Sequence, residues 1–160
     1  MATVREAAEA DLASICALGE EVNSVHHQAF PSIFAGPGSP ERDRAHWSSS
    51  ITKADSACLV AVEAGTVVGF VTVAVVNENH SLLQPGRFGR IGSVGVAARM
   101  RGQGIGVALM RQAEVWASER GATELRLNVW AFNEPALAMY RELGYEVRSH
   151  QFAKALRSSA

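Results

Sequence analysis

Residues 88–109 carry the sequence FGRIGSVGVAARMRGQGIGVAL, and this stretch decides the fold. We predict a strand over its first part, Phe88–Val96. In its last part, Ile105, Ala108 and Leu109 recur at spacings of three and four residues, which predicts a helix with one buried face. A strand followed by a helix makes the connection between them the place to look for a ligand site.

That connection holds glycine at three alternate positions, Gly102, Gly104 and Gly106, beside Arg99 and Arg101. Glycine lets backbone N–H groups turn toward one point because no Cβ stands in the way. The first turn of the following helix adds unpaired N–H groups and a partial positive charge. The combination favours an anion site suited to phosphate or pyrophosphate over a simple turn.

Two common phosphate-binding motifs do not fit this loop. A P-loop places Lys and then Ser or Thr directly after its last glycine, and neither follows Gly106. A dinucleotide-binding loop would need Gly or Ala where Val107 or Leu109 stands. Both a nucleoside triphosphatase and a dinucleotide enzyme are therefore disfavoured.

Outward from this stretch, apolar periodicity and turn residues divide the rest of the chain into alternating elements. Ala64-Gly65 separates two valine-rich strands and predicts a tight hairpin. Gly121 and Gly144 follow predicted helices as stop signals. The other predicted strands cover Thr3–Glu6, Ala57–Glu63, Thr66–Val76, Leu125–Val129 and Tyr145–Leu156, and the other helices cover Leu12–His26, Ser39–Ser50 and Pro135–Leu143. This order predicts an α/β (α+β) fold with a mixed sheet, part antiparallel and part parallel.

Length and composition set the broad class. The 160 residues predict a single domain, residues 1–160, with 48% hydrophobic and 19% charged residues. A net charge of −1 disfavours nucleic acid as a partner. The N-terminus lacks the apolar core of a signal peptide and no apolar run is long enough for a membrane span, so we expect a cytoplasmic protein with no membrane partner. Cys16 and Cys58 form no metal-binding spacing, and no metal is expected.

Two motifs in order resemble a known family. Val94-x-Val96 followed by Arg101-x-x-Gly104-x-Gly106 resembles the coenzyme A signature of the GNAT N-acetyltransferases. Asn133-x-x-Ala136-x-x-x-Tyr140-x-x-x-Gly144-Tyr145 resembles the second signature of that family, with Tyr145 where Phe is commoner. The resemblance implies a GNAT-like fold: a central, mostly antiparallel sheet with a splayed parallel strand pair, flanked by about four helices.

The resemblance also implies a cosubstrate, acetyl-CoA, and the residues that hold it. The backbone of Val94, Gly95 and Val96 is expected to pair with the pantetheine arm as an added strand does. Asn133 and Ala136 are expected to contact the cofactor, and Tyr140 to point its hydroxyl at the thioester sulfur. The pyrophosphate is expected on the backbone amides of Arg101, Gly102, Gln103, Gly104, Ile105 and Gly106. A homodimer is a further implication of the family.

The expected activity is transfer of an acetyl group to a primary amine by direct attack on the thioester. Tyr140 is the predicted catalytic acid, since its hydroxyl can protonate the leaving thiolate. Many family members carry an acid where Gly92 and Ser93 stand, and neither of these can take a proton from an ammonium. Either a water chain or a residue outside the strand is then expected to do so. His26 and His27 are the predicted substrate-binding residues and, with Glu20, Glu21, Glu78 and His80, candidates for the base.

Three functions stay open at this point. The first is an N-acetyltransferase for a small-molecule amine or a peptide. The second is a sensor module that binds CoA without catalysis, motivated by the missing acid at Gly92 and Ser93. The third is an acetyltransferase for protein N-termini or lysines, because the N-terminal third carries no recognisable signature for the acceptor.

Overall fold

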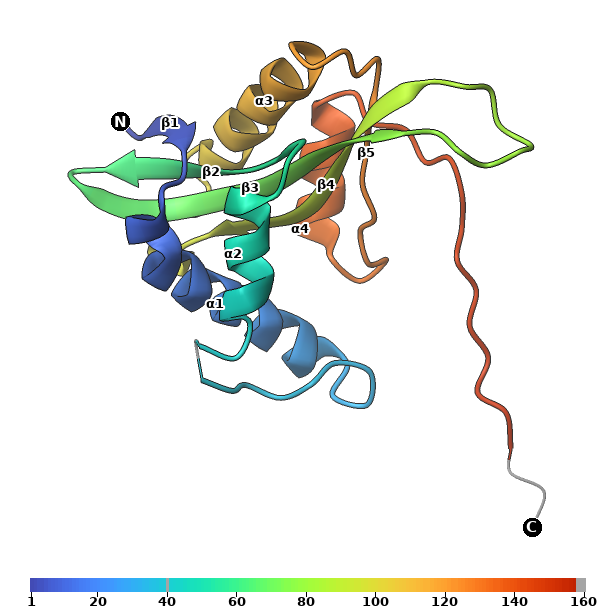
Figure 1. Cartoon of the computed structure of the whole chain (residues 1–160). Helices are drawn as coiled ribbons and strands as arrows, with labels where there is room; N and C mark the ends of the chain where they lie inside the picture. The colour runs from blue at the N-terminus through green and yellow to red at the C-terminus, as the bar shows by residue number, and fades with distance from the viewer. Residues whose placement is uncertain (40, 158–160) are drawn as a thin grey trace. The chain divides into compact units, whose positions relative to one another are not determined.

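The computed structural model describes residues 1–39 and 41–157. The chain folds as two compact units, Met1–Asn128 and Val129–Ala160. The first unit carries every strand found in the described part of the chain. Its elements (Figure 1) are β1 (Thr3–Glu6), the short 3-10 helix η1 (Glu9–Asp11), α1 (Leu12–Ala29), α2 (Arg44–Thr52), β2 (Ser56–Glu63), β3 (Thr66–Asn77), β4 (Arg87–Val96), the 3-10 helix η2 (Ala98–Met100), α3 (Ile105–Ser118) and β5 (Leu125–Arg126).

The strands form one sheet in the order β1-β2-β3-β4-β5, which is also their order along the chain. The first three pairings are antiparallel and the last, between β4 and β5, is parallel. Ala64 and Gly65 join β2 to β3 with φ values of +48° and +76°, as a two-residue turn with both central residues left-handed requires. The mixed sheet with an antiparallel majority and one parallel pair confirms the predicted fold class.

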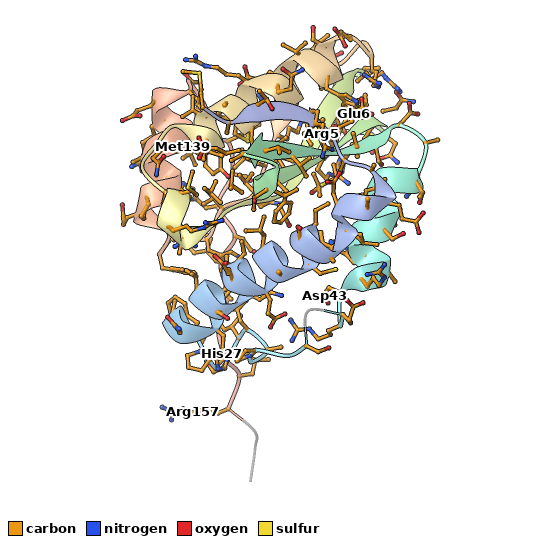
Figure 2. All side chains as sticks on the ribbon, turned by 90° about the vertical axis from the view of Figure 1, so that its left-hand side faces the viewer. Arg5, Glu6, His27, Asp43, Met139 and Arg157 are labelled. Atoms are coloured by element: carbon orange, nitrogen blue, oxygen red, sulfur yellow. The ribbon has the colours of Figure 1, made fainter. Side chains whose placement is uncertain are left out.

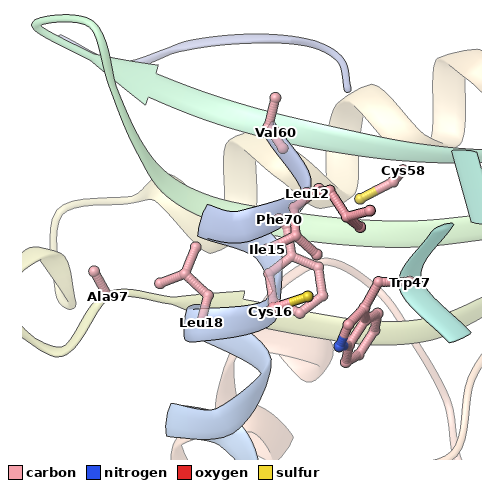
Figure 3. Close-up of a cluster of buried hydrophobic side chains, with 9 residues drawn as sticks. All are labelled: Leu12, Ile15, Cys16, Leu18, Trp47, Cys58, Val60, Phe70 and Ala97. Carbon is pink, nitrogen blue, oxygen red and sulfur yellow. The ribbon is translucent and has the colours of Figure 1, made fainter. Parts of the chain in front are cut away.

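One face of the sheet packs against α1 and α2, and α3 covers the other (Figure 1). On the first face Ile15 from α1, Trp47 from α2 and Phe70 from β3 lie in one buried cluster (Figure 3). Trp47 lies directly over Gly19, where an added Cβ would come within 2.7 Å of the indole ring. Glycine inside a helix costs about 1 kcal/mol relative to alanine, and here it lets the large indole reach the sheet.

On the other face, α3 buries Leu109, Met110 and Ala113 completely. Gly69 of β3 receives this helix, because a Cβ there would lie 3.1 Å from side-chain atoms of both Ile105 and Leu109. Full burial of a side chain as large as leucine contributes about 1.5–3 kcal/mol to folding. The helix that follows the glycine connection is therefore fixed to the sheet from its first residue onward.

The second unit contains α4 (Glu134–Glu142), within one residue of the predicted helix at either end. The Asn133 side chain accepts a hydrogen bond from the Ala136 amide at 3.3 Å and caps this helix. Gly144 follows it with a φ of +89°, which confirms the predicted stop signal. In the described residues of both units, no helix is long and apolar enough to cross a membrane.

Three boundaries differ from the sequence prediction. The helix predicted over Ser39–Ser50 begins at Arg44, because residues 41–43 form a turn; Pro40 lies outside the described residues. The strand predicted over Leu125–Val129 is reduced to β5, and that predicted over Tyr145–Leu156 is wrong for its described residues. An extended segment becomes a strand only through backbone pairing, and no ladder in the described chain includes residues 145–157.

Candidate functional site

The two edges of β4 are occupied differently along its length. On one edge β3 pairs with the strand from Arg87 to Val96. On the other edge β5 pairs with Gly89 and Arg90 alone. Among the residues that the structure describes, no strand pairs with this second edge beyond Arg90. The second edge from Ile91 to Val96 is therefore open, as a splayed parallel pair requires.

A β-bulge interrupts β4 within this open part. Val71 of β3 lies opposite Val94, but Val73 lies opposite Ile91, so Gly92 and Ser93 together face the single residue Thr72. The Ser93 amide donates a hydrogen bond to the Thr72 side-chain oxygen at 2.9 Å. The bulge is thus closed by a side chain from the neighbouring strand.

The hydrogen bonds around the bulge show which backbone groups point to the open edge. Ser93 donates its N–H toward β3, and so does Ala97, to the Val68 carbonyl at 2.9 Å. Because backbone groups alternate in direction along a strand, the N–H and C=O groups of Val94 and Val96 point the other way, to the open edge. These are the residues predicted to pair with the pantetheine arm.

The glycine connection follows directly on this edge. Gly102 and Gly104 have φ values of +74° and +80°, a left-handed conformation that side chains disfavour, and nothing lies within 4 Å of a Cβ built at either residue. Gly104 is the N-cap of α3 and no side chain caps the helix. Within residues 1–39 and 41–157, no group accepts a hydrogen bond from any of the six amides of residues 102–107. The loop therefore offers unpaired donors and open space, which is the chemistry of an anion site.

Side chains of the connection divide into two roles. Ile105 is only 6% exposed and packs in the core, so its backbone alone can reach a ligand. Gln103 and Arg101 are exposed. The Arg101 Nε donates to the Val96 carbonyl at 3.2 Å, which places a guanidinium at the junction of the open edge and the loop.

Helix α1 lies against the same end of β4. A Cβ at Gly95 would come within 3.0 Å of the Val22 side chain, and the Glu21 carboxylate accepts the Ala98 amide at 3.2 Å. His26 folds back along the helix, its Nδ1 2.8 Å from the Val22 carbonyl. A carbonyl can only accept, so Nδ1 carries the hydrogen and the neutral ring has its basic lone pair on Nε2.

Two other predicted base candidates, His27 and Glu20, form hydrogen bonds with backbone groups of the loop that follows α1. Figure 2 shows His27 at the end of α1, and its Nδ1 lies 2.9 Å from the Phe34 carbonyl. Glu20 accepts the Gly38 amide at 2.7 Å and lies 3.5 Å from the Arg42 guanidinium. Both side chains thus hold the loop between α1 and α2, where Asp43 precedes α2 (Figure 2).

Glu78 and His80 lie in the connection between β3 and β4, beside Arg87 at the start of β4. Eight residues of strand separate Arg87 from Gly95, which is about 26 Å. Glu78 lies 2.5 Å from the Arg126 guanidinium, and this hydrogen bond holds the pKa of Glu78 below its ordinary value. A paired carboxylate at the far end of the strand is poorly suited to take a proton at the open edge.

In the second unit, Tyr140 makes an edge-to-face contact with Tyr145, with ring centroids 5.8 Å apart. Burial raises the pKa of the Tyr140 phenol. The hydroxyl therefore keeps its proton to higher pH than an exposed tyrosine and remains a hydrogen-bond donor. The Asn133 side-chain oxygen caps α4. The predicted contact of Asn133 with the cofactor stays a prediction.

Sequence reasoning did not identify Thr72 or Val22 as parts of this site. Thr72 carries the only polar side chain between Val67 and Val76, and that isolated hydroxyl was the available signal. Val22 gave no signal, because an apolar residue on a helix stripe looks the same over any strand.

Comparisons with known proteins point to one family. The sequence matches the family model described as "Acetyltransferase (GNAT) family" over residues 20–145. It is 42% identical over 93 residues to a streptothricin acetyltransferase of Streptomyces lavendulae, covering 58% of this chain and 46% of that protein. It is 30% identical over 112 residues to N-acetyltransferase family 8 member 2 of Rattus norvegicus, covering 70% and 48%. The chain spans about half the length of these curated relatives.

Solved structures share the fold. A mutant of the BH1408 protein of Bacillus halodurans matches with a TM-score of 0.90 at 21% identity, over 97% of this chain and 99% of that one. The aminoglycoside 6'-N-acetyltransferase AAC(6')-Ig of Acinetobacter haemolyticus matches with a TM-score of 0.73 at 20% identity, over 97% and 99%. AAC(6')-Iy, solved with a bisubstrate analog made of CoA and acetylneamine, matches with a TM-score of 0.73 at 15% identity, over 98% and 99%.

Proposed function

The chain belongs to the GNAT acetyltransferase family, and from that premise we propose that it transfers the acetyl group of acetyl-CoA to a primary amine. The observation that carries the proposal is the continuity of two features: the open edge of β4 at Val94 and Val96, and the loop with six unpaired amides that follows it. An extended arm with polar amides fits the first feature, and a pyrophosphate fits the second. The two compact units act as one transferase domain in this proposal.

The binding of acetyl-CoA uses backbone far more than side chains. The Val94 carbonyl and the Val96 amide point to the open edge and pair with the pantetheine amides, with Gly95 between them, while the Val96 carbonyl stays bonded to Arg101. The amides of residues 102–106 surround the pyrophosphate. The Arg101 amide donates to the Ala98 carbonyl at 3.4 Å, and the Arg101 guanidinium adds positive charge. Asn133 and Ala136 of the second motif complete the contacts with the pantetheine arm.

The reaction needs a neutral amine, a donor for the oxyanion and a proton for the leaving sulfur. The amine nitrogen attacks the thioester carbon, the C–N bond forms and the C–S bond breaks. The backbone N–H of Val94 stabilises the oxyanion, and Tyr140 gives its phenolic proton to the thiolate. The phenol is protonated at neutral pH, and burial raises its pKa further, so Tyr140 holds its proton until negative charge develops on the sulfur.

We assign the proton acceptor to His26. Its Nδ1 lies 2.8 Å from the Val22 carbonyl, its ring packs edge-on against Phe34, and Val22 itself packs over Gly95 on β4. Neither Gly92 nor Ser93 can accept a proton, and Glu78 is paired to Arg126 at the opposite end of the strand. An imidazole on α1 is therefore the group best suited to take the proton that the amine loses on attack.

The proposed acceptor is a small-molecule primary amine. The support is the streptothricin acetyltransferase, whose name states a small-molecule acceptor and which is 42% identical over the matched region. The aminoglycoside acetyltransferases with the same fold point the same way. A peptide acceptor is the alternative to be measured beside it.

The test is release of free thiol by the purified chain from acetyl-CoA in the presence of small amines, aminoglycosides, streptothricin and peptides. We expect thiol release that depends on a small amine. A Tyr140→Phe variant should keep its CoA affinity and lose about 100-fold in kcat, since a positioned acid contributes at least that much. Calorimetry that shows CoA binding without release for any acceptor would instead identify a sensor module.

A further inference from the structure

We propose that Thr72 is a positioning residue of the acetyltransferase site: its hydroxyl builds the β4 bulge that turns the Val94 and Val96 backbone to the open edge. The inference rests on the proposed function for its catalytic consequence. Thr72 is 9% exposed, and its neighbours Val71 and Val73 are buried. A buried hydroxyl costs free energy unless it is hydrogen-bonded, so its presence in this strand calls for a partner, and the Ser93 amide at 2.9 Å is that partner.

The bulge reverses the direction in which the backbone groups of β4 point. Before it, Gly89 donates its N–H to the Glu124 carbonyl at 2.9 Å, on the side of β5. Unbroken alternation would carry that direction to Ile91, Ser93 and then Gly95, and would leave Val94 and Val96 bonded to β3. The extra residue opposite Thr72 shifts the pattern by one, so Ser93 and Ala97 donate toward β3 instead.

The hydrogen bond that Thr72 accepts allows two residues of β4, Gly92 and Ser93, to lie opposite the single residue Thr72 of β3. The Ser93 N–H needs an acceptor on the side of β3, and the Thr72 side-chain oxygen supplies one at hydrogen-bond distance. Without this oxygen the Ser93 amide would lose its partner. It would regain one most directly by slipping into ordinary pairing, which would point the Val94 amide away from the open edge.

The same hydroxyl accounts for glycine at position 92. A Cβ built on Gly92 would lie 2.6 Å from the Thr72 Oγ1, closer than real side chains approach. Any side chain at 92, a carboxylate included, must displace the hydroxyl that closes the bulge. Thr72 and Gly92 therefore form a matched pair: the bulge requires glycine at position 92 and leaves no room there for an acidic side chain.

The test compares Thr72→Val, which keeps the shape and removes the hydroxyl, with Thr72→Ser, which keeps the hydroxyl. Thr66→Val is the matched control, because Thr66 is exposed on the same strand. Amide hydrogen exchange at Ser93, measured by NMR, reports the bond directly and needs no activity. Steady-state kinetics with acetyl-CoA report its catalytic consequence.

We expect Ser93 to exchange at least about tenfold faster in Thr72→Val than in wild type or Thr72→Ser. We expect kcat to fall about 10–100-fold in Thr72→Val, with a smaller change in KM for acetyl-CoA, since the loop amides still hold the pyrophosphate. The kcat values of Thr72→Ser and Thr66→Val should stay within about threefold of wild type, which is a smaller change than the loss expected for Thr72→Val.

Two results would overturn the inference: protection of Ser93 that survives in Thr72→Val, or equal kcat values for the folded Thr72→Val and Thr72→Ser variants. If Thr72→Val does not fold, Thr72→Ala replaces it in the same comparison. If wild type binds CoA but acetylates nothing, the proposed function fails. The Ser93 exchange rate and the shifts of the Val94 and Val96 amides on addition of CoA then still decide whether Thr72 sets the bulge.

Discussion

The two halves of β4 differ in what their backbone is bonded to. In the first half, Gly89 and Arg90 pair with strands on both sides. Arg87 adds three further bonds, to the Asn77 side chain, to the Arg120 carbonyl and to Asp55. In the second half one edge is open and a bulge turns its groups outward. An exposed strand edge invites pairing with other chains, and here the exposed length is short and begins beside a firmly held segment.

The difference teaches that the closed half serves as the anchor and the open half as the binding edge. A strand that is fixed at one end can offer unpaired groups at the other without losing its register. Changes at the open half should therefore alter ligand binding and turnover, whereas changes at the closed half should alter stability and leave CoA affinity unchanged.

The largest expected effect is at the loop that follows the open half. Gly104→Asp places a carboxylate where the pyrophosphate is proposed, in a backbone conformation with a φ of +80°. Like-charge repulsion costs several kcal/mol, so CoA affinity measured by calorimetry should fall by at least about 100-fold. Gly65→Asp is the matched control, because Gly65 has a similar φ of +76° in the β2–β3 turn and open space around it. Equal affinities in the two variants would refute the loop as the pyrophosphate site.

The next effect concerns His26 of α1, the helix whose Val22 packs over Gly95 in the open half. His26→Gln should keep CoA affinity and lower kcat by about 100-fold, the usual contribution of a positioned base. His27→Gln is the matched control, since both rings contact Phe34 of the following loop, His26 through its ring edge and His27 through the Phe34 carbonyl. Steady-state kinetics on both variants measure the contrast. If both lose the same activity, α1 contributes through its loop and His26 is not the base.

The smallest effect is at the closed half. Arg126 lowers the pKa of Glu78 below the ordinary 4.5, so the ionised carboxylate stabilises the folded state. That contribution is complete above the ordinary value and is lost as the pH falls through the lowered pKa. Glu78→Gln should lower Tm at pH 7 by about 2–4 °C, and the difference from wild type should shrink toward pH 3.

Thermal unfolding at several pH values measures this prediction, and CoA affinity should not change. Glu41→Gln is the control, because Glu41 is 61% exposed in its pair with Arg44 and such pairs contribute little. A constant difference in Tm from pH 7 to pH 3 would show that the Glu78 charge is not the source of the stability.

The sequence predicted the parts of the site that a short segment determines by itself. Three alternating glycines were enough to predict the loop, because the positive φ values of Gly102 and Gly104 depend on the local sequence alone. The bulge could not be predicted, since it depends on which residue of β3 meets Gly92 and Ser93. Register between strands is set by packing and turns far from the residues concerned.

The same limit applies to the base candidates. His26 and Glu78 were both base candidates in the sequence, because chain order does not say which part of the sheet α1 packs against. The structure places Val22 of α1 over Gly95 and Glu78 beside Gly86, at opposite ends of β4. The strand prediction for the segment after α4 was wrong for a related reason. Apolar residues at Tyr145 and Val147 permit an extended chain, but backbone pairing decides whether that chain is a strand.

The sheet order has a consequence for how the protein folds. Strands β2, β3 and β4 are neighbours both in space and along the chain with no helix between them, so their antiparallel pairings close through short loops. The parallel partner β5 can pair with β4 only after the chain has crossed through α3. This pairing joins residues farther apart in the chain than the β2–β3 and β3–β4 pairings do, and such pairing is slow. The anchor half of β4 is thus completed after β2, β3 and β4 have paired, and we expect the binding edge to gain its rigidity only when β5 has joined.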